Sequence, residues 1–144
     1  MKLLTSPKAQ YLLFAGVEVL HEQSIEWLNE IAFWRDETAF LYSLLVNKTL
    51  RFVPITAKNN IERVEAELIT LTGGELDDLQ QAVELHEKVL NNVVSGKHTA
   101  DEQSYREQHY QLTLTFNKFE TRFKFLKKEI FDLAKQAANI EQNK

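Results

Sequence analysis

The chain lacks cysteine altogether and contains only four glycines and two prolines among its 144 residues. Without cysteine it cannot form a disulfide framework, a thiolate nucleophile, a zinc finger or an iron–sulfur cluster. Any bound metal would need histidine and carboxylate ligands. Because glycine and proline supply most tight turns, their scarcity predicts few and long secondary-structure elements.

An excess of positive charge is also lacking, since the chain has 17 Lys and Arg residues and 21 Asp and Glu residues. Nucleic-acid binding usually needs a clear basic excess to neutralise phosphates. No segment approaches the roughly 20 uninterrupted apolar residues of a membrane span. The apolar run 11–17 resembles a signal peptide only superficially, because Glu18 follows it at once and no small-residue cleavage site is present. We therefore expect a cytoplasmic protein without nucleic-acid or membrane partners.

What the chain does contain is the composition of a folded domain, with 44% hydrophobic and 26% charged residues. A chain of this length can bury one substantial core. No internal repeat and no shift in composition marks a second domain. We predict a single helical-bundle domain over residues 1–144, in which 1–16 form a short N-terminal segment.

In two long stretches, mostly apolar residues recur at alternating steps of four and three. This spacing is typical of a helix with one buried stripe. In the last third the stripe comprises Tyr105, His109, Leu112, Phe116, Phe119, Phe123, Leu126, Ile130, Leu133, Ala137 and Ile140. In the first third it comprises Leu20, Ser24, Trp27, Ile31, Trp34, Thr38, Leu41 and Leu45. The pattern predicts helices over about 17–49 and 100–140, and Thr99 or Asp101 can cap the second one.

A third stripe predicts a middle helix over about 59–95, ended by Gly96, but its phase shifts halfway. Its members are Ile61, Val64, Leu68 and Leu71, followed by Leu76, Leu79, Val83, His86, Leu90 and Val93. The shift falls on Gly73 and Gly74, a pair that costs about 2 kcal/mol relative to alanines in a helix interior. It marks either a kink or a break. A kink, which we favour, gives an all-α fold, a long antiparallel three-helix up-down-up bundle, whereas a break gives a four-helix bundle.

Reversals of the chain near residues 54 and 98 would bring three of the four histidines into one layer. The helical rise then places His21 opposite residue 87, next to His86, and places His86 opposite residue 110, next to His109. The reversal near residue 54 also sets Trp34 opposite Gly74, where the indole would fill the space that the glycine leaves.

This layer has two interpretations. Neutral imidazoles together with Glu18, three residues before His21, suit zinc, iron or nickel. Alternatively His21, His86 and His109 form a structural polar layer that selects helix register. We favour the structural interpretation because a histidine on a buried stripe is commonly a satisfied core residue. Ferritin-like di-iron bundles use two Glu-x-x-His motifs, and residues 18–21 form the only one here.

A second apolar row accompanies the main stripe of the first helix at Phe33, Phe40 and Leu44, and Phe125 lies off the stripe of the last helix. Each helix of a three-helix bundle has two neighbours, so part of this width is required. Any part that stays exposed predicts an interface with a second copy or with a partner helix. No Gly-x-Ser-x-Gly or phosphate-binding glycine motif is present. We therefore predict a non-enzymatic interaction or self-association module, with a metal-binding bundle as the alternative.

Overall fold

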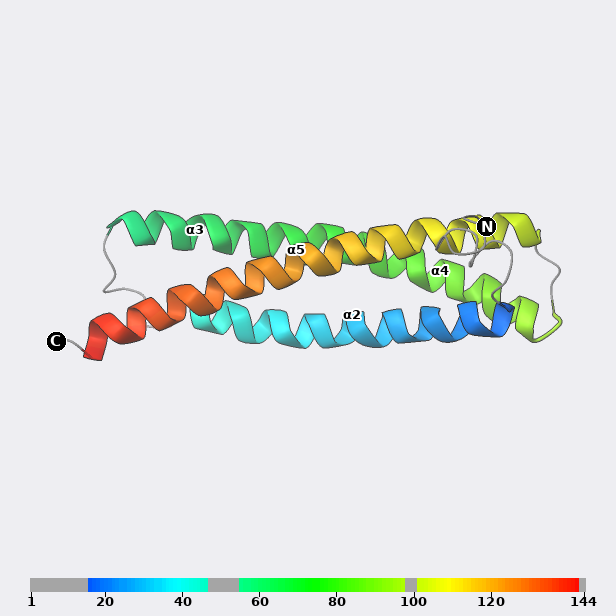
Figure 1. The fold of residues 1–144 in the computed structure, drawn as a ribbon, viewed down its shortest axis with the longest axis horizontal. Helices are drawn as coiled ribbons and strands as arrows, with labels where there is room; N and C mark the ends of the chain where they lie inside the picture. The colour runs from blue at the N-terminus through cyan, green and yellow to red at the C-terminus, as the bar shows by residue number, and fades with distance from the viewer. Residues whose placement is uncertain (1–15, 47–54, 98–100, 143–144) are drawn as a thin grey trace, which may run out of the picture. The chain divides into compact units, whose positions relative to one another are not determined.

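The regular structure of this chain is helical wherever it is described. A computed structural model describes residues 16–46, 55–97 and 101–142, which form the elements shown in Figure 1. They are α2 (Val17–Leu45), α3 (Ile55–Thr70), the π-helical turn η4 (Leu71–Glu75), α4 (Leu76–Val94) and α5 (Glu102–Gln142). The run from α3 through η4 to α4 is one continuous, kinked helix, and it packs with α2 and α5. The predicted three-helix bundle with a kinked middle helix is confirmed.

The π turn explains the phase shift of the middle stripe. Leu71 and Leu76 are both buried, although they stand five positions apart rather than three or four. In η4 the Leu76 N–H donates a hydrogen bond to the Leu71 carbonyl, which is the five-residue bond of a π-helix. The turn therefore absorbs one extra residue and keeps both halves of the stripe on the buried side.

The glycines in this turn do not serve the purpose we predicted for them. A Cβ atom built on Gly73 or Gly74 would meet nothing within 4 Å, so the prediction that the Trp34 indole fills space beside Gly74 is wrong. The extra residue of the π turn leaves both glycines exposed. The Trp34 ring instead lies against α5, with centroids 5.0 Å from Phe119 and 5.9 Å from Phe123.

The helix ends agree with the sequence more closely at α4 and α5 than at α3. Gly96 has a φ of 70°, and the Lys97 N–H donates to the Asn92 carbonyl at 3.0 Å, the bond of a Schellman motif. Asp101 directly precedes α5 and its carbonyl accepts from the Tyr105 N–H at 3.1 Å. The middle helix starts at Ile55, earlier than predicted, while Thr99 and residues 47–54 lie outside the described ranges.

The chain divides into two compact units, each built from segments of all three long helices. Unit 1 takes residues up to Ile31 and Asp78–Lys118, and unit 2 takes Ala32–Asp77 and the residues from Phe119 onward. Nearly all predicted stripe positions are buried; Thr38 and Val93 are half-buried, and the Ile140 side chain lies outside the described residues. The prediction of a single domain over residues 1–144 stays a prediction.

Candidate functional site: a buried histidine pair and an exposed aromatic face

Unit 1 buries two histidines in direct contact. His86 of α4 and His109 of α5 are both fully buried, and Nε2 of His86 lies 2.9 Å from Nδ1 of His109. The other nitrogen of His109, Nε2, lies 2.8 Å from the side-chain oxygen of Gln23 on α2. The Trp27 ring stacks on the His109 ring at a centroid distance of 4.6 Å. All three helix segments of unit 1 therefore meet at His109.

The partners of this histidine pair set the direction of its hydrogen bonds. A carboxamide oxygen only accepts, so the Gln23 oxygen requires a proton on Nε2 of His109. Neutral His109 then accepts at Nδ1 from the Nε2–H of His86. The remaining lone pair lies on Nδ1 of His86, a buried atom with no hydrogen-bond partner among the described residues. The two imidazoles thus form a chain that ends in an open acceptor at His86.

Both histidines are neutral at physiological pH. Burial lowers the pKa of His86 to about 4, an effect that a weak interaction with the side chain of Gln108 partly opposes, although Nδ1 has no partner within hydrogen-bonding geometry in the described ranges. Burial lowers the pKa of His109 to about 3, and a charge on His86 would lower it further. A protonated imidazole in this core would lose its hydration without gaining a counter-ion. The neutral, hydrogen-bonded pair is therefore the stable form.

The other two predicted metal ligands, His21 and Glu18, are not part of the His86–His109 pair. Nδ1 of His21 is 2.7 Å from a carboxylate oxygen of Glu87, the residue that the reflection placed opposite it, and Glu18 is exposed. In the described part of the chain no group of three or more His, Asp or Glu side chains is arranged to hold a metal ion. Gln23 and Trp27 were not identified from the sequence as partners of His109. Counting residues from a turn places a residue only to within about one helical turn, so it cannot choose between adjacent positions.

Unit 2 carries an exposed patch that we call the aromatic face, made of Phe33, Phe40 and Leu44 of α2 and Phe131 of α5. Phe33 is 57% exposed, Phe40 is 56% exposed and Leu44 is half-buried. The rings of Phe40 and Phe131 lie 6.5 Å apart. Within the patch, Glu37 of α2 accepts a hydrogen bond at 2.8 Å from Nζ of Lys127 of α5. The face therefore spans two helices around one ion pair.

The spacing along α2 shows why this face is left uncovered. Phe33, Glu37, Phe40 and Leu44 follow steps of four, three and four, one position before the main stripe. They form a second stripe beside the one that the bundle buries. The α5 helix covers only part of it, because both Phe33 and Phe40 keep more than half of their surface exposed. The predicted interface residues on α2 are thus accessible.

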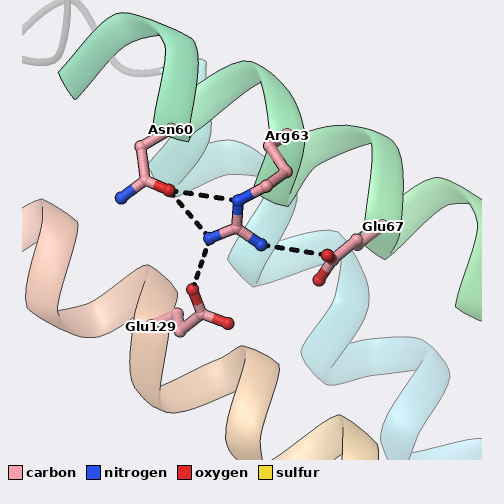
Figure 2. Close-up of polar contacts among 4 residues, drawn as sticks. All are labelled: Asn60, Arg63, Glu67 and Glu129. Carbon is pink, nitrogen blue, oxygen red and sulfur yellow. Dashed lines mark hydrogen bonds and ion pairs between the residues drawn. The ribbon is translucent and has the colours of Figure 1, made fainter. Parts of the chain in front are cut away.

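The opposite side of α5 is held to α3 by polar contacts. Figure 2 shows the Arg63 guanidinium of α3 between Asn60 and Glu67 of its own helix and Glu129 of α5. Its bond to Glu129 is 2.7 Å long. Phe125, which we also predicted as an interface residue, lies on this side at 67% exposure. It lines a shallow groove of about 290 Å³ together with Glu67, Leu71, Thr121, Arg122 and Leu126.

Comparison with protein-family models, with curated proteins and with solved structures finds no match to this chain. No helix in the described ranges is long and apolar enough to cross a membrane. A function must therefore be argued from the chemistry of the chain. Two features stand out, the buried histidine pair of unit 1 and the aromatic face of unit 2.

Proposed function

We propose that this chain is a non-enzymatic, cytoplasmic interaction module that self-associates through the aromatic face. The exposure of Phe33 and Phe40 on one stripe of α2 carries this proposal. Burying apolar surface contributes roughly 25 cal/mol per Å², and an exposed apolar patch that spans two helices is typical of an interaction site. A second protein surface that covers the aromatic face would bury the parts of Phe33 and Phe40 that α5 leaves exposed.

A pair of substitutions tests the aromatic face. The double variant Phe33→Gln with Phe40→Gln keeps good helix formers on α2 and removes the two exposed rings. We expect the wild-type protein to show a mass above 16.8 kDa by light scattering, and the variant to return to that mass with unchanged helix content. Phe125→Gln is the matched control, since it removes an even more exposed ring from the other side of α5. A wild-type protein that stays monomeric at high concentration would disprove self-association.

For the histidine pair we propose a structural role, because each histidine already has a protein partner. The alternative is a metal-binding site for zinc, iron or nickel that recruits His21 and Glu18. The open Nδ1 of His86 is the observation in its favour, since a buried imidazole lone pair is a metal ligand.

Elemental mass spectrometry of untagged protein, before and after incubation with each ion, separates the two roles. The structural role predicts no stoichiometric metal. Near-stoichiometric metal that disappears in His86→Leu would instead support the metal site.

A further inference from the structure

The central Glu37–Lys127 pair of the aromatic face has a further acidic residue beside it on α2, Asp36, and a further basic residue beside it on α5, Lys128. Asp36 and Glu37 lie on α2 between Phe33 and Phe40 in sequence. On α5 the residues one turn before Phe131 are Lys127 and Lys128, and Lys124 lies one turn further back, while Asp132 follows Phe131 directly. Lys124 and Lys128 are exposed, and the Lys124 ammonium lies 3.6 Å from Glu120 on its own helix. A surface with acidic residues on one side of such a pair and basic residues on the other is complementary to a copy of itself when the two sides exchange.

Contacts inside one copy establish which residues of the two helices lie at the same level. Glu37 pairs with Lys127, and one turn further along both helices Phe40 meets Phe131. The two helices therefore run parallel to each other, and residue numbers increase in the same direction along both. A second copy that docks in parallel would bring matching levels together across the interface.

Two symmetric arrangements can bury this face, and electrostatics distinguishes them. In a parallel dimer, with the two-fold axis along the helices, α2 of one copy packs on α5 of the other. Glu37 then meets the Lys127 of the second copy, and the two Phe40–Phe131 pairs form one cluster. In an antiparallel dimer α2 packs on α2, so Asp36 and Glu37 meet the same acidic residues. Like charges in contact disfavour that arrangement.

We infer that the partner of the aromatic face is a second copy of this chain, docked in parallel so that α2 of each copy packs on α5 of the other. This inference rests on the proposed self-association and adds its geometry. The interface is isologous, as in most homodimers. Its centre holds four phenylalanine rings, two from each copy, and the flanking acidic and basic residues exchange partners between copies.

Single cysteines test this geometry directly, because the chain contains none of its own. One variant carries Asp36→Cys on α2 and a second carries Lys128→Cys on α5; both positions are exposed. The two proteins are mixed, allowed to exchange subunits and mildly oxidised, so that a disulfide between the two different chains can only be intermolecular. We expect the mixture, and neither protein by itself, to give a species of twice the chain mass that disappears on reduction. A mixture of Asp36→Cys with Ala66→Cys, an exposed position on α3, is the control and should give none.

Each other outcome has a distinct meaning. Asp36→Cys cross-linking with itself as readily as with Lys128→Cys would overturn the parallel geometry in favour of the antiparallel one. A dimer by light scattering that forms neither cross-link would overturn both geometries and leave self-association standing. Monomeric protein without any cross-link would overturn this inference and the proposed function together.

Discussion

At the scale of single residues, the histidine pair is asymmetric, because His109 bonds Gln23 as well as His86, whereas Nδ1 of His86 has no hydrogen-bond partner among the described residues. Replacing His109 by leucine would remove the bonds to Gln23 and His86 and the stacking with Trp27. His86 would then keep two unpaired nitrogens in a buried site. Replacing His86 by leucine strands only the Nδ1 acceptor of His109.

We therefore expect His109→Leu to lower the free energy of unfolding more than His86→Leu does, by roughly 1–3 kcal/mol. Urea unfolding of both variants and the wild type measures this difference. Equal losses, or a larger loss for His86→Leu, would contradict this difference between the partners of the two histidines.

The same pair makes stability depend on pH. Histidine in an unfolded chain has a pKa near 6.5, while burial lowers the pKa of His86 to about 4 and that of His109 to about 3. Between these values the unfolded chain binds more protons, so the free energy of unfolding falls as the pH falls. By about pH 5 the loss should reach roughly 2 kcal/mol per histidine.

Urea unfolding at about pH 7.5 and about pH 5 measures this loss. The double variant His86→Leu with His109→Leu serves as the control, because it retains every carboxylate and should lose much less stability over the same interval. A variant as acid-sensitive as the wild type would assign the effect to other groups.

The sequence placed His86 and His109 correctly as neighbours but missed Gln23. Adjacency follows from helix rise and the position of a turn, which are regular. The choice of Gln23 as the partner of His109 depends on side-chain rotamers, which no periodicity encodes. The same limit explains why the aromatic face was predicted from Phe33, Phe40 and Leu44, while its central ion pair was not.

At the scale of elements, the steps of four and three predicted the buried side of every long helix. That success has a simple cause, since a stripe of apolar side chains can only be buried on one side of a helix. The start of α3 was predicted less well, since it was expected near residue 59 and the helix begins at Ile55. Asn60, a residue type that often caps helices, lies inside α3. Its side-chain oxygen instead accepts from Arg63 within the helix. Local capping chemistry did not decide where this helix begins.

Three glycines, Gly73, Gly74 and Gly96, offer a test of helix geometry. Neither Gly73 nor Gly74 has a positive φ, and added Cβ atoms there meet open space. Alanine at either position should raise the free energy of unfolding by about 0.5–1 kcal/mol, because it restricts the unfolded chain. Gly96 has a φ of 70°, so Gly96→Ala should lower the free energy of unfolding by about 1 kcal/mol.

Thermal or urea unfolding of the three single variants checks these signs. A loss of stability in Gly73→Ala or Gly74→Ala would show that the π turn needs glycine for a reason that its geometry does not reveal.

At the scale of the whole molecule, the two tryptophans of the chain report on different units. Trp27 belongs to unit 1 and Trp34 to unit 2. The variants Trp27→Phe and Trp34→Phe therefore each keep one fluorescent probe. A single domain, as the sequence predicts, requires the two units to unfold together, and α2 and α5 each contribute residues to both of them.

We expect each variant to show the same unfolding midpoint by its own fluorescence as by circular dichroism, which reports on all helices. Any stability that the phenylalanine substitution itself costs affects both signals of one variant alike. Fluorescence and circular dichroism that separate in either variant would mean that the units unfold independently.

The π turn at Leu71–Glu75 also has a consequence for changes in chain length. It holds one residue more than a regular helix needs, and the residues before and after it keep their buried positions. A turn of this kind accommodates one extra residue locally within a helix. A chain shorter by one residue at this turn would return Leu71 and Leu76 to a spacing of four and bury the same side chains. We therefore expect the loss of one residue at this turn to leave the stripe buried, whereas the loss of one residue elsewhere in the middle helix would rotate the stripe out of the core.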